Sequence, residues 1–188
     1  MNLPNKLTVF RIFLIPVFLI LINIPTKVGI LGALFVFIVA SLTDQLDGYI
    51  ARKYNLITNF GKLMDPLADK LLVSAAFIFF VEFGLVDSFL VIIIISREFI
   101  VTGIRLVLAE SGEVVAANFY GKMKTVFQIV SVIFLNLKFY NKMIGIPDPY
   151  GLVIGMIGDF TFYICVILTI ISGLDYVMKN IKGLREVL

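Results

Sequence analysis

Four aspartates in one stretch of the chain have the spacing needed to hold a divalent metal ion. Asp44 and Asp47 are three residues apart, and Asp65 and Asp69 are four residues apart. On a helix either spacing puts both carboxylates on one face. Two such pairs brought together repel each other, and a divalent cation relieves that repulsion. Ligand sets made only of oxygen suit Mg²⁺ or Mn²⁺.

Residues between the two aspartate pairs point to phosphate binding. Gly48 and Gly61 let the backbone approach a ligand closely, and the planar guanidinium of Arg52 matches a phosphate group. The sequence contains no His. Histidine bases, Ser-His triads and phosphohistidine intermediates are thereby excluded, so acid–base work falls to Asp, Glu, Lys or Tyr. The stretch from Asp44 to Lys70 is interpreted as a metal-and-phosphate site.

The composition indicates the class of protein that must position this site. The chain has 188 residues, 60% hydrophobic and 15% charged, with a mean hydropathy of +1.04. Soluble domains are closer to half apolar and a quarter charged. We therefore expect an all-α integral membrane protein with a single domain over residues 1–188. A soluble all-α protein is the alternative, and the composition disfavours it. The net charge of +3 is small, so a bilayer rather than a nucleic acid is the expected partner.

Six apolar segments of roughly 20 residues have the length that a bilayer requires. They cover about residues 7–24, 28–43, 61–81, 88–109, 116–137 and 150–177. The polar N-terminal residues before them predict a short interfacial helix, and the aspartate stretch joins the second and third segments. Charged residues interrupt several segments. This pattern indicates a polar cavity facing the interior of a six-helix bundle.

Lys and Arg residues predict the orientation of the bundle. With the N-terminus inside, 13 of the 16 Lys and Arg residues lie on the inner side and 3 on the outer side. Cytoplasmic loops carry such an excess. The bias puts both termini and the aspartate stretch on the cytoplasmic side of the cell membrane.

Written as a pattern, residues 44–69 read D-x2-D-G-x2-A-R-x8-G-x3-D-x3-D, which resembles the signature of the CDP-alcohol phosphotransferase family. All eight fixed positions are present: Asp44, Asp47, Gly48, Ala51, Arg52, Gly61, Asp65 and Asp69. The resemblance extends over the whole chain, since the family has six spans with this motif joining the second and third. It also implies a homodimer formed through the membrane helices.

The family resemblance implies a role for each motif residue. The four aspartates would hold Mg²⁺ or Mn²⁺, as two ions, and Asp69 would also serve as the general base. The CDP-lipid would lie against Gly48, Ala51, Arg52 and Gly61. Close helix–helix packing is the alternative role of the small residues.

Four further segments resemble the bacterial phosphatidylglycerophosphate synthase branch of the family. They are residues 2–18, 63–72, 96–105 and 121–125. This resemblance implies transfer of the phosphatidyl group from CDP-diacylglycerol to sn-glycerol 3-phosphate, with release of CMP. A relative that uses serine, inositol phosphate or phosphatidylglycerol as acceptor is the first alternative. A divalent-cation transporter and a non-catalytic adaptor are more distant ones.

Basic residues within the apolar segments are candidates for binding the acceptor's phosphate, because intramembrane cations are costly unless they serve a ligand or pair with an acid. The candidates are Arg97, Arg105, Lys122 and Lys124. Arg97 lies about two helical turns deeper than Arg105, so it ranks last, and it could instead form a structural ion pair with Glu98. The two lysines are about 200° apart on a helix, which leaves one of them facing the cavity.

Two residues of the first segment are expected to line the site from the cytoplasmic face. They are Thr8 and Arg11. For Arg11 the alternative is an anchoring role at the membrane surface.

Overall fold

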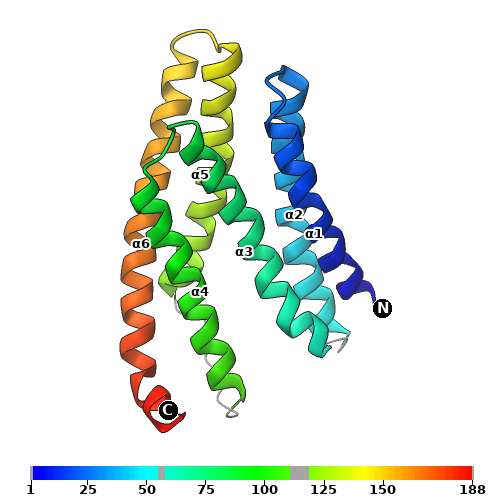
Figure 1. Cartoon of the computed structure of the whole chain (residues 1–188), viewed down its shortest axis with the longest axis vertical. Helices are drawn as coiled ribbons and strands as arrows, with labels where there is room; N and C mark the ends of the chain where they lie inside the picture. Colours follow the sequence, from blue (N-terminus) through cyan, green and yellow to red (C-terminus); the bar gives the residue numbers. More distant parts are fainter. Residues whose placement is uncertain (1, 55–57, 111–118, 188) are drawn as a thin grey trace.

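The computed structural model is a bundle of six α-helices (Figure 1). It describes residues 2–54, 58–110 and 119–187, and within these ranges it leaves out the side chains of residues 45–49, 51–52, 59–60, 62–63, 109–110 and 181–187. The helices are α1 (Leu3–Ile22), α2 (Lys27–Lys53), α3 (Asn59–Glu82), α4 (Ser88–Glu110), α5 (Phe119–Ile144) and α6 (Tyr150–Val187). The prediction of an all-α fold is confirmed.

Local sequence signals explain where the helices begin and end. Thr58 caps α3 by accepting a hydrogen bond from the backbone N–H of Gly61 at 3.1 Å. Asp87 does the same for α4, with its Oδ1 2.8 Å from the backbone N of Phe89. Such side chains satisfy N–H groups that the first turn of a helix leaves without partners. Gly84 follows the end of α3 with a φ of 64°, a conformation that costs glycine little.

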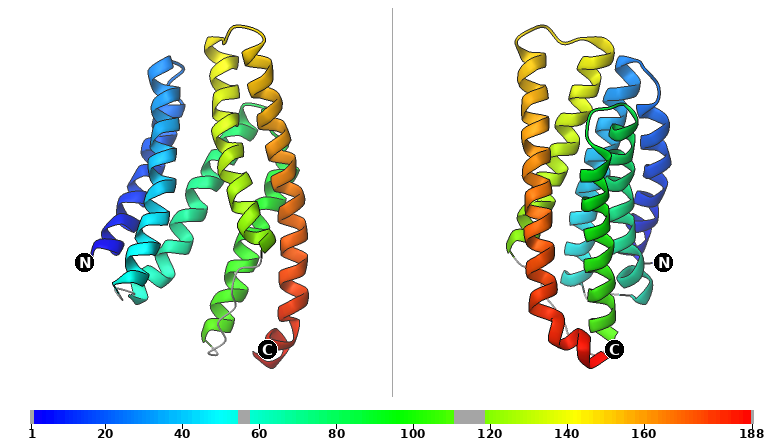
Figure 2. Two further views of the ribbon diagram at one scale, coloured as in Figure 1. Left: turned by 180° about the vertical axis from the view of Figure 1, so that it is seen from behind. Right: turned by 60° about the vertical axis from the view of Figure 1, so that its left-hand side comes forward.

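Two antiparallel helix pairs flank the middle of the bundle (Figure 1). One pair is α1 with α2, and the other is α5 with α6. Helix α3 runs obliquely between the pairs, and α4 packs against α3 and α6 (Figure 2). The turns after α1, α3 and α5 lie at one end of the bundle, and both termini lie at the other end. The start of α3, which carries the second aspartate pair, is at the end where the termini lie.

Aromatic side chains fill much of the core. Phe139 of α5 packs edge-on against Phe79 of α3 and against Phe83, which caps the C-terminal end of α3, with ring centroids 5.1 and 4.8 Å away. Phe18 of α1 meets Phe37 of α2 at 6.1 Å. These contacts help to hold together the half of the bundle away from the termini.

The outer surface of the bundle is apolar, with exposed Phe, Ile, Leu and Val side chains on every helix. Within the described residues, four helices are long and apolar enough to cross a membrane, namely α1, α2, α5 and α6. Helices α3 and α4 have 24 and 23 residues, also enough to span a bilayer, but they carry the charged residues of the interior. The protein is a multi-pass membrane protein, and six spans are compatible with this structure.

Two boundary predictions need correction. The expected interfacial helix is not a separate element, because α1 runs without a break from Leu3 to Ile22. Pro4 lies in the first turn of α1, where the N–H that proline lacks would have no partner within the helix. Helix α6 continues through the polar tail to Val187 instead of ending near residue 177. No proline interrupts that tail, so a change in polarity alone did not end the helix.

Candidate functional site

Two adjoining cavities lie among the helices, in the half of the bundle that holds the polar residues. The aspartate cavity, of about 90 Å³, is lined by Arg11, Ala40, Ser41, Asp44, Asp69, Lys70, Leu72, Val73, Glu98, Lys124, Thr125, Gln128 and Ile129. The cationic cavity, of about 170 Å³, is lined by Asp69, Lys70, Arg97, Glu98, Val101, Thr102, Arg105, Gly121, Lys124, Thr125 and Tyr176. Asp69, Lys70, Glu98, Lys124 and Thr125 line both.

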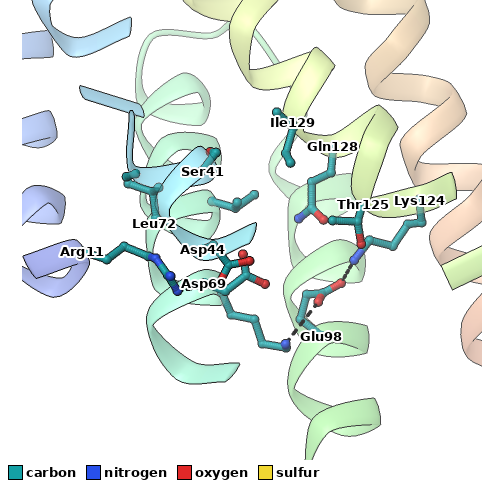
Figure 3. Close-up of a pocket in the computed structure, with 13 residues that line it drawn as sticks. Arg11, Ser41, Asp44, Asp69, Leu72, Glu98, Lys124, Thr125, Gln128 and Ile129 are labelled. Carbon is teal, nitrogen blue, oxygen red and sulfur yellow. Dashed lines mark hydrogen bonds and ion pairs between the residues drawn. The ribbon is translucent and has the colours of Figure 1, made fainter. Parts of the chain in front are cut away.

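Asp44 is held by a buried arginine from α1. The Arg11 guanidinium Nη1 lies 2.6 Å from Asp44 Oδ1, and the arginine is fully buried. Figure 3 shows Arg11 reaching from α1 to the carboxylates of Asp44 and Asp69, which both point into the aspartate cavity. A fully buried side chain cannot anchor the protein at the membrane surface, so the geometry favours the site-lining alternative for Arg11.

Asp65 is also held from α1. The hydroxyl of Thr8, which is fully buried, donates a hydrogen bond to Asp65 Oδ1. One helical turn earlier, Asn5 Oδ1 accepts a hydrogen bond from the Thr58 hydroxyl at 2.9 Å. Helix α1 thus orients both the start of α3 and one of its aspartates.

Gly61 lies in this same contact between α1 and α3. A Cβ added to it would lie 3.3 Å from Asn5 Oδ1, from Thr58 Oγ1 and from Asp65 Oδ2. Gly61 lines neither cavity among the described residues. Its surroundings therefore match the close-packing alternative, and contact with a CDP-lipid stays a prediction.

Other motif residues lie on α2 where side chains are not described. They are Asp47, Gly48, Ala51 and Arg52. Among the described residues no three acidic, His or Cys side chains form a group able to hold a metal ion. The donors that are described, on Asp44, Asp65 and Asp69, are all carboxylate oxygens, and Arg11 and Thr8 restrain two of them. A restrained set of hard oxygen donors fits Mg²⁺ or Mn²⁺.

Glu98 lies at the centre of a buried cluster of charges shared by the two cavities. Its carboxylate accepts a hydrogen bond from Lys124 Nζ. Lys70 Nζ lies 3.8 Å from its Oε2, and Arg97 Nη1 lies 3.6 Å from its Oε1. Figure 3 shows Glu98 with Lys124, both pointing between α4 and α5. One carboxylate therefore orients three cations.

The structure separates the predicted acceptor residues. Lys124 is buried and lines both cavities, whereas Lys122 is exposed and lines neither. The helical rotation between the two lysines turns Lys122 outward, so Lys124 is the one that faces the cavity, and acceptor binding by either lysine stays a prediction. The structure gives no reason to rank Arg97 below Arg105. Arg97 and Arg105 line the same cavity, since residues eight apart lie on one helix face and the cavity extends along it.

Among the charged and aromatic residues that line the cationic cavity, sequence reasoning does not single out Lys70, Glu98 and Tyr176. The sequence suggests Glu98 only as an ion-pair partner of Arg97. In the structure Lys124 also donates a hydrogen bond to the Glu98 carboxylate. The position of Glu98 next to an intramembrane arginine is a sequence signal for a buried charge cluster. Lys70 directly follows Asp69 in the sequence, and this position marks it as a candidate for the same site. Nothing in the local sequence marks Tyr176.

In chemical terms, the arrangement puts carboxylates suited to a divalent metal beside a cavity whose cations suit a phosphate. Curated relatives match nearly the whole chain. The CDP-diacylglycerol–glycerol-3-phosphate 3-phosphatidyltransferase of Bacillus subtilis (strain 168) is 49% identical over 196 residues, covering 98% of this chain and 97% of the relative. Proteins of the same name from Rickettsia typhi and Haemophilus influenzae are 42% and 36% identical, covering 93% and 97% of this chain and 94% of each relative.

Residues 1–171 match the family profile described as CDP-alcohol phosphatidyltransferase. This match includes the complete aspartate motif and the residues of α1 that hold it. Together with relatives at up to 49% identity over nearly full length, it establishes that the chain belongs to the CDP-alcohol phosphatidyltransferase family.

Proposed function

We propose that the protein transfers the phosphatidyl group of CDP-diacylglycerol to sn-glycerol 3-phosphate, giving phosphatidylglycerol phosphate and CMP. The observation that carries the proposal is the position of Asp69, which lines both the aspartate cavity and the cationic cavity. A carboxylate at this position can reach a hydroxyl whose phosphate is held in the cationic cavity. The names of the relatives from three bacterial groups support the same reaction.

In the proposed reaction Asp69 accepts the proton of the acceptor's primary hydroxyl. The oxygen then attacks the phosphorus that carries diacylglycerol. A new P–O bond forms there while the bond from that phosphorus to the bridging oxygen breaks. The electron pair leaves with CMP, and the proton on Asp69 returns to solvent. Arg11 and Thr8 contribute by holding the carboxylates of Asp44 and Asp65 in place.

Divalent cations would be held by Asp44, Asp47, Asp65 and Asp69, as one or two Mg²⁺ or Mn²⁺ ions. When bound, such ions neutralise the pyrophosphate and stabilise the leaving oxygen. The CDP-lipid would lie against the α2 residues Gly48, Ala51 and Arg52.

The charge of the cationic cavity supports glycerol 3-phosphate as the acceptor. Four cations line it, Lys70, Arg97, Arg105 and Lys124, against the two carboxylates of Asp69 and Glu98. Among the described residues this is an excess of two positive charges, which balances a phosphate monoester, whose charge approaches −2 at neutral pH. Serine and a neutral polyol offer no such dianion, so this cavity favours a phosphorylated acceptor.

We further propose that the protein is a homodimer in the cell membrane. In this proposal the end of the bundle that holds both termini and the aspartates faces the cytoplasm. The excess of Lys and Arg at that end supports this orientation. Lys6 is in the first turn of α1 and Lys27 is the first residue of α2, and both are exposed. These two helices begin at opposite ends of the bundle (Figure 1). A membrane-impermeant maleimide should label Lys27→Cys but not Lys6→Cys in intact cells, with permeabilised cells as the positive control. Crosslinking in membranes tests the dimer.

The deciding experiment is CMP release from CDP-diacylglycerol by the purified protein, with each acceptor supplied alone. Glycerol 3-phosphate should support release, and serine, inositol phosphate and phosphatidylglycerol should not. A clear preference for one of those three would replace the proposed acceptor. The transporter alternative predicts uptake of Mn²⁺ into proteoliposomes without any CDP-lipid, and we expect no such uptake.

A further inference from the structure

The cationic cavity has a wall on α6 that the aspartate motif does not predict. Tyr176 lines this cavity and is 4% exposed. Its hydroxyl is buried and has no hydrogen-bond partner among the described residues. Buried hydroxyl groups are nearly always paired in folded proteins. A buried O–H at the wall of a cavity is therefore a group that a bound ligand can satisfy.

Helix α6 also supports both arginines of this cavity. The Arg105 guanidinium carbon lies 5.9 Å from the centre of the Tyr176 ring, within the range of a cation–π contact. One turn earlier, a Cβ added to Gly173 would come within 3.0 Å of the Arg97 side chain. The face of α6 bearing Gly173 and Tyr176 thus helps to position both arginine side chains at the cationic cavity.

The face bearing Gly173 and Tyr176 is near the C-terminal end of the chain, far in sequence from the aspartate motif. The family profile covers residues 1–171, and both Gly173 and Tyr176 follow it. Members of the family share the donor and differ in the acceptor alcohol, as the resemblance implies. A residue that lines the cationic cavity from α6, apart from the aspartate motif, is well placed to discriminate between acceptors.

We infer that Tyr176 is a specificity-determining residue whose hydroxyl donates a hydrogen bond to the phosphate of the acceptor, while its ring holds Arg105 in place. The inference rests on the proposed function for the identity of the acceptor. The role of Tyr176 requires only that a phosphate group binds between α4 and α6. That phosphate could belong to the acceptor or to the donor lipid, and the experiment distinguishes these two.

The test is Tyr176→Phe, which removes the hydroxyl and keeps the ring beneath Arg105. Tyr163→Phe is the matched control, because Tyr163 is on the same helix and 56% exposed. In Tyr176→Phe the KM for glycerol 3-phosphate should rise about tenfold or more, the loss expected for one hydrogen bond to a charged group. The kcat and the KM for CDP-diacylglycerol should stay within about twofold, and Tyr163→Phe should match the wild type.

Inorganic phosphate supplies a second measurement that does not need turnover. Its Kd, from ³¹P NMR titration of the detergent-solubilised protein, should rise in Tyr176→Phe by about the same factor as the KM. An unchanged acceptor KM, a risen KM with unchanged phosphate affinity, or a selective rise in the KM for CDP-diacylglycerol would each overturn the inference. If the wild type does not use glycerol 3-phosphate, the proposed function fails, and the phosphate titration still decides the role of Tyr176.

Discussion

The guanidinium of Arg11 lies 2.6 Å from the carboxylate of Asp44, although the two residues are 33 positions apart in the chain, and the arginine is fully buried. Helix α1 therefore contributes a positive charge to the aspartate cavity from outside the motif. Taking away the buried arginine removes the charge that holds the partly exposed Asp44 carboxylate in place.

This relationship predicts that Arg11→Gln lowers kcat/KM at least about tenfold, equivalent to 1.4 kcal/mol of lost stabilisation. Lys6→Gln is the control, because Lys6 is on the same helix but exposed. CMP release measures the activity, and thermal unfolding in detergent separates loss of fold from loss of orientation. Full activity in Arg11→Gln would show that Asp44 needs no partner from α1.

Metal removal tests the aspartate cavity directly. EDTA should abolish CMP release, and Mg²⁺ or Mn²⁺ should restore it. Ca²⁺ should restore little, because it prefers more ligands at longer distances. Undiminished turnover in EDTA would exclude a metal-dependent reaction.

Replacement of the proposed base should reduce turnover more than binding. Asp69→Asn keeps the shape of the side chain and removes the proton acceptor, so kcat should fall at least about 10²-fold, the lower end for loss of a general base. Asp87→Asn is a matched control at the opposite end of the bundle, since Asn caps a helix as well as Asp does. A near-normal kcat in Asp69→Asn would assign the base to another residue.

Removal of a cation from the cationic cavity should weaken acceptor binding selectively. Arg105→Ala should raise the KM for glycerol 3-phosphate by roughly 10–150-fold, the equivalent of about 1.5–3 kcal/mol for a charge-assisted contact. The KM for CDP-diacylglycerol should change less. Lys122→Ala should have no effect, because Lys122 is exposed and outside the cavity. Equal KM values in both variants would contradict the placement of the acceptor.

The buried charge cluster should also matter for stability. Glu98→Gln removes the negative charge that three cations share, and we expect it to cost about 3 kcal/mol, the lower end for breaking a buried pair. Asp175→Asn weakens a pair with Lys179, which is 67% exposed, and should cost no more than about 1 kcal/mol. Thermal unfolding of both variants in one detergent provides the comparison. Equal losses of stability in the two variants would mean that the Glu98 charge cluster stabilises the protein no more than an exposed ion pair does.

Sequence by itself was sufficient for the fold class and for the aspartate motif that marks the family. Apolar segments of bilayer length are a local property of the chain, and so is the spacing of Asp44, Asp47, Asp65 and Asp69 on their helices. Local signals such as Thr58 and Gly84 also mark helix ends in the sequence. None of these features depends on how the helices pack against each other.

Only the tertiary structure decided which distant side chains meet. Thr8 reaches Asp65 across 57 positions of sequence, and Tyr176 lies beneath Arg105 from another helix. The rotation of α5 about its axis decides that Lys124, and not Lys122, faces the cavity. The direction in which the cavity extends decides that Arg97 lines it. Rotation and packing are set by contacts between whole helices, so no short stretch of sequence contains them.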